Sequence, residues 1–323
     1  MRLKLAGFLV ALGMTVLPSV GHAQPFPSKV ITIVVPFPAG GATDVVARAI
    51  AQGMSGSIGH QVIVDNRPGA NGSIGTALVA KSKPDGYMLV MGGVNTHAMN
   101  DALYKNLPYD SLKDFSPIAL TARIPVAFVV HPSLPVKSIR ELIDLAKSQP
   151  GQLTYGSSGA GGPHHLAMEL FKSLAKVDIV HVPYKGGAPQ LNDLLGGHIK
   201  IGAIGLPPAL PHIQAGSLRP LAVTEAKRSV FMPDLPTVAE AALPGFEVTY
   251  WLGLLGPAGM PNDIVEKLNS EIVAVLKRPD VQEQLGKQGA EVVTSTAAEF
   301  RSMLTAEVAK WAKVVKEANV SLD

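Results

Sequence analysis

The stretch PFPAGGATD, residues 36–44, decides the fold of this chain. It separates an apolar, β-branched run at 30–35, which is typical of a buried strand, from an apolar run at 45–50 that favours a helix. The prolines end the strand, because proline lacks the N–H that a central ladder needs. The stretch is therefore expected to be a loop that leads from the carboxyl end of a core strand into a helix.

The same loop has the residues of an anion site. Gly40 and Gly41 permit a tight turn and let a ligand approach bare backbone. Thr43 or Asp44 can cap the helix that follows. We expect free N–H groups here, at a helix N-terminus beyond the end of a strand, which is an arrangement that binds anions in open α/β sheets.

Apolar β-rich runs alternate with helical patterns along the chain, which predicts α/β units around mostly parallel sheets. The pattern restarts near residue 124 and changes again near residue 247. We therefore expect a signal peptide at 1–23, domain 1 formed by 24–123 plus 247–323, and an inserted domain 2 at 124–246. Two chain crossings between the domains make a hinge and leave a cleft. The expected strands after the first lie at 61–64, 87–91, 127–130, 153–155, 179–182, 199–204 and 218–223, and the expected helices at 74–80, 138–148, 163–174, 190–195, 262–277 and 297–318.

Two more glycine-rich stretches follow expected strands. GSSGAGG at 156–162 leads into Pro163, a residue that is favoured at the first position of a helix, and Ser157 and Ser158 add hydroxyl donors. GGVNTH at 92–97 is a third candidate. Each stretch alone is equally compatible with an ordinary turn between strand and helix. If the first two face each other across the cleft, they form two amide-lined surfaces for an anion.

Composition restricts the function. Apolar residues make up 47% of the 323 residues and charged residues 16%, which predicts a large core. Residues 1–23 combine a basic start, an apolar run at 5–17 that is too short to span a bilayer, and small residues at the end, so we expect removal of this signal peptide and a periplasmic protein. No basic stripe appears, so we expect no nucleic-acid partner.

The sharper catalytic motifs are absent. The chain has no cysteine, no P-loop, no dinucleotide fingerprint and no HExxH, and we expect no cofactor and no metal. A GxSxG elbow is nearly present at 156–160, where Ala160 replaces the last glycine. With His164 and His165 close by, this near match leaves open an exported serine hydrolase that uses Ser158.

Five motifs resemble those of a known family. They are PFPAGG-x-x-D at 36–44, DNRPGA at 65–70, HVPYKG at 181–186, LPPALPHIQAG at 206–216 and LGPAG at 255–259. Together they resemble the substrate-binding proteins of tripartite tricarboxylate transporters, also called Bug proteins, over essentially the whole mature chain.

The resemblance implies a Venus-flytrap fold, a small carboxylate ligand held between the loops at 39–44 and 157–162, partly through ordered water, and a membrane permease as partner. We expect a monomer that performs no chemistry. A ligand sensor that docks on a signalling protein would have the same pocket and stays open. The expected ligand-binding residues are Pro38, Ala39, Gly40, Gly41, Thr43, Asp44, Asn95, Thr96, His97, Ser157, Ser158, Gly159, Ala160, Gly161, His164, Tyr184 and Ile204.

The sequence departs from the family at 203–205. The family usually carries an aromatic, an acidic and a small polar residue before the LPPALP motif, and this chain has Ala203, Ile204 and Gly205. A buried ammonium group without a partner costs several kcal/mol, so Ile204 predicts a ligand that lacks an ammonium group. Alternatively, Ile204 faces the domain core and Asp44 or another carboxylate supplies the partner.

Overall fold

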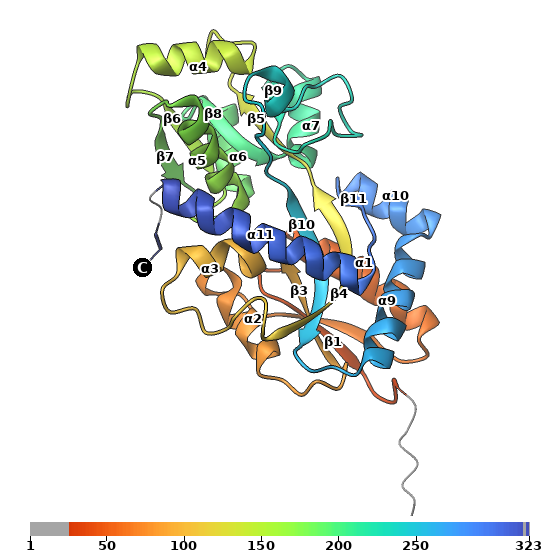
Figure 1. Cartoon of the computed structure of the whole chain (residues 1–323). Helices are drawn as coiled ribbons and strands as arrows, with labels where there is room; N and C mark the ends of the chain where they lie inside the picture. The colour runs from red at the N-terminus through yellow and green to blue at the C-terminus, as the bar shows by residue number, and fades with distance from the viewer. Residues whose placement is uncertain (1–25, 319–320, 323) are drawn as a thin grey trace, which may run out of the picture.

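The computed structural model describes residues 26–318, 321 and 322. Figure 1 shows two lobes, each built on its own sheet, with helices packed around both. The predicted α/β class with two domains is confirmed. The predicted signal peptide, residues 1–23, lies outside the described residues.

The first lobe contains a six-stranded sheet in the order β11-β4-β10-β3-β1-β2. β1 pairs with β2 and β3 in parallel, whereas β10 runs antiparallel between β3 and β4, and β11 is antiparallel to β4. The strands are β1 (Ile31–Val35), β2 (Val62–Asn66), β3 (Met88–Gly93), β4 (Phe115–Ile124), β10 (Tyr250–Pro257) and β11 (Glu291–Val292).

Helices cover both faces of this sheet. Ile31, Ile33 and Val35 of β1 pack into an apolar cluster with α1 and α9, whereas Val34 belongs to the cluster that contains α2 and α11. A strand that is buried on both faces is apolar along nearly its whole length, which explains the continuous run in the sequence. The helices of this lobe are α1 (Ala42–Ser57), η1 (Ala70–Gly72), α2 (Ser73–Ala80), η2 (Asn95–Met99), α3 (Asn100–Leu103), α9 (Asn262–Leu276), α10 (Pro279–Lys287) and α11 (Ala297–Ala318).

The second lobe contains a five-stranded sheet in the order β7-β6-β8-β5-β9. β6 is parallel to β7 and β8, and β5 is antiparallel to β8 and β9. The strands are β5 (Val126–Val130), β6 (Thr154–Ser157), β7 (Val180–Pro183), β8 (Ile201–Gly205) and β9 (Arg219–Val223). The helices are α4 (Ile139–Ser148), α5 (Pro163–Ala175), α6 (Gly187–Leu195), α7 (Leu206–Gln214) and α8 (Val238–Ala241).

The chain crosses between the lobes twice, and the two crossings lie side by side. Pro125 alone separates β4 from β5 on the way out. On the way back, Val248 N–H donates to Thr224 O at 2.8 Å, and Thr224 Oγ1 donates to Val248 O at 2.9 Å. Thr224 N–H also donates to Val126 O at 2.9 Å, which ties the return to the outward crossing. Neighbouring crossings of this kind form one compact hinge.

Helix α11 makes a further connection between the lobes. It lies across the middle of the molecule in Figure 1 and contacts α5 of the second lobe as well as β4 and α3 of the first. Glu307 on α11 accepts hydrogen bonds from Trp251 Nε1 and Trp311 Nε1, both at 3.1 Å. One apolar cluster consequently runs from Val34 in the first sheet to Phe128 in the second.

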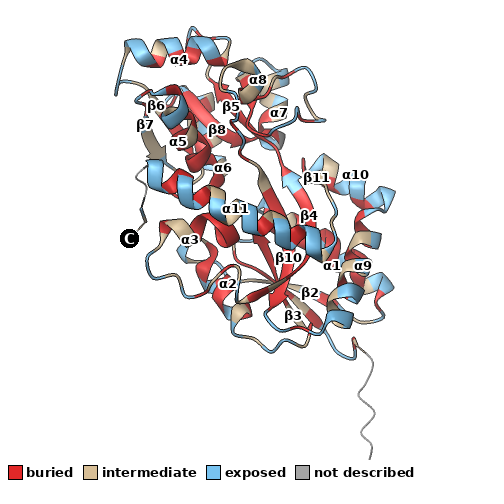
Figure 2. Cartoon of the chain, viewed as in Figure 1, coloured by how far each residue is buried: buried red, intermediate tan, exposed pale blue. Residues whose placement is uncertain are grey.

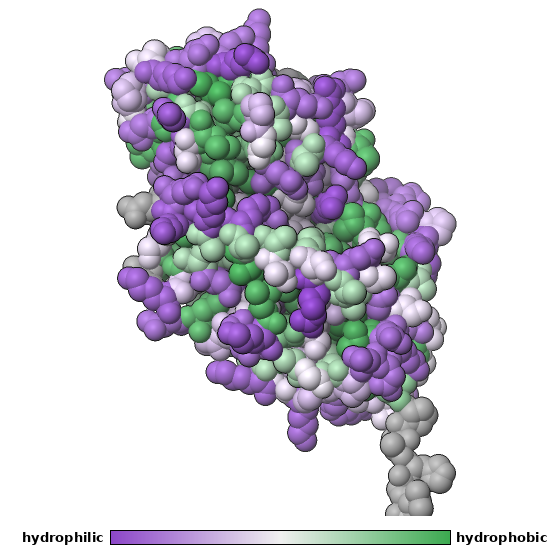
Figure 3. Space-filling model, viewed as in Figure 1, coloured by the Kyte–Doolittle hydropathy of each residue, from purple (hydrophilic) through white to green (hydrophobic). Residues whose placement is uncertain are grey.

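The outer surface is mixed in character. Figure 2 shows buried strands inside and exposed outer faces on the helices, and Figure 3 shows hydrophilic side chains distributed over both lobes on the face in view. Within residues 26–318, 321 and 322, no helix has the length and hydropathy needed to cross a bilayer.

Glu225, directly beyond Thr224 at the crossings, should make stability depend on pH. Its side chain is buried, and burial together with Glu291 and Glu247 raises its pKa to about 7 against the opposing charge of Arg123. The carboxyl is then protonated in the folded state over a range where the unfolded chain, with a pKa of 4.5, has already ionised. Its contribution to stability is therefore complete below about pH 4.5 and decreases as the pH rises towards 7.

We expect Glu225→Gln to raise the Tm at pH 8 by about 2–3 °C, which corresponds to about 1–2 kcal/mol for a chain of this size, and to leave the Tm at pH 4.5 nearly unchanged. Thermal unfolding followed by circular dichroism at both pH values tests this. The same increase at both pH values would contradict a titration effect.

Candidate functional site

The first glycine loop is exposed at its centre and anchored at its end. Residues 38–42 are exposed, whereas Thr43 and Asp44 are buried. Gly40 has a φ of +83°, in the left-handed region that favours glycine. The N-cap of α1 is Gly41, with no side-chain capping bond, so the predicted cap by Thr43 or Asp44 is wrong.

Asp44 instead reaches back from the first turn of α1 and braces the loop. Gly40 N–H and Arg48 Nε both donate to its Oδ2 at 2.9 Å, and Asn66 Nδ2 donates to its Oδ1 at 2.9 Å. Asn66 Nδ2 also donates to Phe37 O at 3.1 Å, which holds the other end of the loop. Burial acts to raise the pKa of Asp44, but the hydrogen bonds from Arg48, Gly40 and Asn66 outweigh it and hold the pKa below its ordinary value. Asp44 is therefore an ionised structural group.

The amide donors differ from the expected set. Gly40 N–H is occupied by Asp44 and is not free for a ligand. A helix leaves its first N–H groups without intrahelical acceptors, and at the start of α1 these belong to Gly41, Ala42 and Thr43. The helix macrodipole adds partial positive charge at the same place. The anion-binding potential of this loop thus lies in the first turn of α1.

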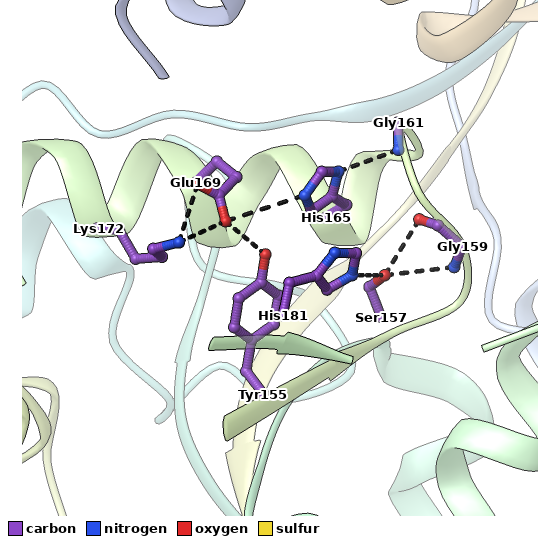
Figure 4. A network of polar contacts seen from close by, with 8 residues as sticks. All are labelled: Tyr155, Ser157, Gly159, Gly161, His165, Glu169, Lys172 and His181. Atoms are coloured by element: carbon purple, nitrogen blue, oxygen red, sulfur yellow. Dashed lines mark hydrogen bonds and ion pairs between the residues drawn. The ribbon is translucent and has the colours of Figure 1, made fainter. Parts of the chain in front are cut away.

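The second glycine loop, after β6, is held by two histidines (Figure 4). His181 Nε2 lies 2.7 Å from Ser157 Oγ, and Gly161 N–H donates to His165 Nδ1 at 3.0 Å. Ser157 Oγ donates to Gly159 O at 3.0 Å and accepts from Gly159 N–H at 3.3 Å. The amides of Gly159 and Gly161 are consequently occupied by the protein itself, so this surface has fewer free amides than expected.

Ser158 and His164 form a close pair beside this loop. Ser158 Oγ lies 2.5 Å from His164 Nδ1. Burial lowers the pKa of His164 to about 4, and its Nε2 has no hydrogen-bond partner among the described residues. A serine hydrolase needs a third group that orients and supports the base. Within the part of the chain that the structure describes, His164 Nε2 has no such group, so the geometry of the pair gives the hydrolase no support.

Tyr250, the first residue of β10, brings the two loops together. Its Oη lies 3.4 Å from Thr43 Oγ1 in the first lobe, and its ring packs edge-on against the ring of His164 in the second, with centroids 6.4 Å apart. Gly161 of the second loop lies beside Leu103 and Asn71 of the first lobe. The start of α1 and the start of α5 therefore meet around one aromatic side chain at the hinge.

The third glycine stretch lies in the interior. Asn95, Thr96 and His97 belong to a single π-helical turn, η2, and all three side chains are buried. Burial lowers the pKa of His97 to about 3. These residues were expected in the binding site. Asn95 Oδ1 and His97 Nε2 are buried without a hydrogen-bond partner among the described residues, and the expectation stays a prediction.

Tyr184 and Ile204 are also engaged elsewhere. Tyr184 is half-buried, and its Oη donates to Asp193 Oδ2 at 2.7 Å. Ile204 is 1% exposed and belongs to the apolar cluster that includes Val129 and Leu206. The alternative in which Ile204 faces the domain core therefore agrees with the structure, and a ligand-facing Ile204 does not. Pro38, Ala39 and Ala160 are exposed and remain available.

Several residues that shape the site were missed. They are Arg48, Asn66, Tyr250, His165 and His181 as partners of the loops. The spacing of Arg48 four residues after Asp44 is a signal that could have identified their pairing on one helix face. His165 also lies four residues after its partner Gly161, whereas Asn66, Tyr250 and His181 come from distant segments and meet the loops only in the folded chain. No group of three or more His, Asp or Glu side chains within the described residues is arranged to hold a metal ion.

The chain matches a protein family over most of its length. The model of the tripartite tricarboxylate transporter family receptor (TctC) matches residues 46–320. Protein BugT of Bordetella pertussis is 36% identical over 93% of this chain and 92% of its own length.

Solved structures agree. Rpa4515 of R. palustris, with adipate, is 40% identical with a TM-score of 0.82, covering 92% of this chain and 99% of that one. MatC (Rpa3494) from Rhodopseudomonas palustris, with bound malate, is 33% identical with a TM-score of 0.79, covering 90% of this chain and all of that one, 100%. The fold, the motifs and these similarities lead to one conclusion: the chain belongs to the TctC family of tripartite tricarboxylate transporter receptors, the solute-binding proteins also called Bug proteins.

Proposed function

We propose that this protein is a periplasmic solute-binding protein that captures a small carboxylate between the start of α1 and the start of α5 and delivers it to a tripartite transporter in the membrane. The observation that carries the proposal is the meeting of Thr43 and His164 on Tyr250 at the hinge. Two helix N-termini from different lobes then converge where an anion is favoured. Adipate and malate in the structures of two relatives support a carboxylate ligand.

The binding energy does not require a side-chain cation. Arg48 is paired with Asp44, and Arg67 is exposed and paired with Asp65. A hydrogen bond to a charged group contributes about 1.5–3 kcal/mol, and micromolar affinity requires about 8 kcal/mol. Four to six donors from the two helix starts, Ser158 and bound water reach this range before ordering costs are subtracted.

The proposed ligand contacts come from the exposed residues of the two loops and from the buried first turns of α1 and α5 that meet at Tyr250. They are Pro38, Ala39, Gly41, Thr43, Ser158, Ala160 and His164, with Gly40, Asp44, Ser157, Gly159 and Gly161 holding the two loops in shape. The proposal includes export, with removal of residues 1–23, and action as a monomer.

Calorimetry with adipate and malate tests the proposal. We expect one-to-one binding of at least one of them with a Kd in the micromolar range or below, and recovery of the ligand unchanged. Ser158→Ala should weaken binding about tenfold, because it removes one charge-assisted hydrogen bond.

The absence of binding across a panel of C4–C8 mono- and dicarboxylates would contradict the proposal. Hydrolysis of a carboxylate ester that disappears in Ser158→Ala would support the serine hydrolase instead. Co-purification with permease subunits in the presence of the bound ligand, and not in its absence, would support delivery to a transporter.

A further inference from the structure

A stack of three rings lies under the second loop (Figure 4). The ring of His181 on β7 lies between the ring of Tyr155 on β6, with centroids 4.8 Å apart, and the ring of His165 on α5, with centroids 4.0 Å apart. His165 is buried, and His181 is partly buried. Two imidazoles at this distance cannot both carry a positive charge without strong repulsion.

The hydrogen bond from Gly161 fixes the protonation state of His165. Gly161 N–H donates to His165 Nδ1 at 3.0 Å, so this nitrogen must be bare and the ring must be neutral, with its proton on Nε2. His165 Nε2 faces Glu169 Oε1 at 3.9 Å. A proton added at Nδ1 would place two N–H donors opposite each other and break the bond from Gly161, which would leave the Gly161 amide without its acceptor.

The charges around the rings do not favour a second proton. Glu169 Oε1 already accepts from Tyr155 Oη at 2.7 Å and from Lys172 Nζ at 2.8 Å, so its charge is compensated within the network. Burial lowers the pKa of His165, with Glu169 and Lys172 acting in opposite directions. Burial, followed by the charge of His165, lowers the pKa of His181 to about 4. Both rings are therefore neutral at pH 7.

We infer that His165 is a positioning residue for ligand binding: its neutral Nδ1 holds Gly161 and hence the 157–161 loop in the ligand-binding shape, and protonation of that nitrogen releases the loop. This inference rests on the proposed function, in which the loop forms one side of the carboxylate site. The pKa of the His165 imidazole in the folded protein is lowered from 6.5. The stabilisation of the loop by this hydrogen bond is therefore complete above about pH 6.5 and is lost as the pH falls through the folded-state pKa.

Two isosteric variants separate the hydrogen bond from general packing. In His165→Asn the side-chain oxygen takes the place of Nδ1, so it accepts from Gly161 and cannot be protonated. In His165→Gln the polar group takes the place of Nε2 beside Glu169, so the variant stays polar but leaves Gly161 N–H without its acceptor. His131→Asn serves as a control for loss of a histidine, because His131 bonds to Ser133 far from the loop in sequence and structure.

With adipate as the probe at pH 7.5, we expect His165→Asn to bind within about threefold of the unmodified protein and His165→Gln to bind at least tenfold more weakly. As the pH falls below 6.5, the affinity of the unmodified protein should fall more steeply than that of His165→Asn. Titration of adipate itself cancels in this comparison. Equal affinities of the Asn and Gln variants, or parallel pH profiles, would overturn the inference.

A measurement without ligand separates this inference from the proposed function. We expect the amide of Gly161 in the ligand-free protein to exchange with deuterium at least tenfold faster in His165→Gln than in His165→Asn or His131→Asn. Unchanged exchange in His165→Gln would refute the positioning role even if carboxylates bind. Suppose that exchange is faster in His165→Gln but that no form of the protein binds a carboxylate. The positioning role of His165 would then still hold, and the proposed function would be refuted.

Discussion

Asp44→Ala is expected to weaken carboxylate binding about 100-fold or more without unfolding the protein. Asp44 accepts hydrogen bonds from Gly40 N–H, Arg48 Nε and Asn66 Nδ2, all at 2.9 Å. Bonds to an ionised acceptor contribute about 1.5–3 kcal/mol each, and the bond from Arg48 counts for less because that side chain is about half exposed. The remaining two bonds correspond to about 3 kcal/mol, which is a factor of about 100 in affinity if the loop must be reordered before it binds.

The expected loss is one of loop geometry, because Asp44 is buried and saturated by its own partners. Gly40 is the loop residue whose amide bonds directly to this carboxylate. Without the carboxylate, Gly40 N–H loses its acceptor. Asn66 Nδ2 then keeps only Phe37 O as an acceptor, so the Asn66 side chain is less well fixed. The amides that open α1 then no longer point to one position.

Calorimetry with adipate measures this loss, and Asp65→Ala is the matched control. Asp65 also pairs with an arginine, Arg67, two residues away. The Arg67 side chain is 58% exposed and that of Asp65 is 35% exposed, so this variant should bind within about twofold of the unmodified protein. The pKa of Asp44 lies below 3.8, so its contribution should persist above that pH and disappear only as the pH falls through the lowered value. An Asp44→Ala protein with unimpaired affinity would refute the bracing role.

Much of the fold could be predicted because its strands carry strong local signals. β1 and β5 are buried on both faces and therefore appear as uninterrupted apolar runs. Helix α4 could be placed from Ser138, whose side chain accepts from Glu141 N–H at 3.2 Å as a capping pattern predicts.

The sequence did not predict β4 and β10, because each contains residues that are uncommon in strands. β4 contains Pro117, which normally argues against a central strand, but it lies opposite Leu255 at a register shift where the ladder is already interrupted. β10 contains Gly253 and Gly256, which weaken any strand pattern, yet a side chain there would overlap Phe300 and Met260. Contacts with distant helices select these residues, so the local sequence does not reveal the strands.

The candidate site was predictable only in outline. The glycine loops could be found because proline and glycine are common where strands end. The hydrogen-bond partners of their amides could not be predicted. The N–H of Gly40 is bonded to Asp44, and the N–H of Gly161 is bonded to His165, and the sequence does not specify either hydrogen bond. Tyr250 is about 200 positions away from Thr43 in the sequence, and its role depends on where the second crossing returns.

A ligand without an ammonium group is expected to bind at least 100-fold more tightly than its amino-substituted counterpart. The sequence based this expectation on Ile204, which lies in the core and cannot carry it. A second observation supports the expectation independently: the carboxylates of Asp44 and Asp193 are already hydrogen-bonded within the protein. Asp44 is saturated by Gly40, Arg48 and Asn66, and Asp193 accepts from Tyr184 Oη at 2.7 Å.

Glu169, an acidic residue that lies under the second loop, is also bonded to other groups of the protein. Its Oε1 accepts from Tyr155 Oη, and Lys172 Nζ donates to its Oε1 at 2.8 Å and to its Oε2 at 3.0 Å. The ammonium group of Lys172 thus already neutralises its charge. An ammonium group in the closed site would have to displace one of these partners or remain unpaired. A desolvated and unpaired ammonium costs several kcal/mol even after relaxation, which is more than 100-fold in affinity.

Glutarate and glutamate form the matched pair that tests this expectation, because they differ by the ammonium group alone. Competition calorimetry at pH 7.5 should give a Kd for glutamate at least 100-fold above that for glutarate. Adipate and 2-aminoadipate repeat the comparison at the next chain length and remove any effect of an unfavourable length. Equal affinities within either pair would mean that the ammonium keeps a water shell in the bound state, and tighter binding of glutamate would mean that Asp44 or Asp193 gives up its present partner to the ligand. Either result would refute the expectation, since it depends on these carboxylates staying bonded to the protein while the ligand is held.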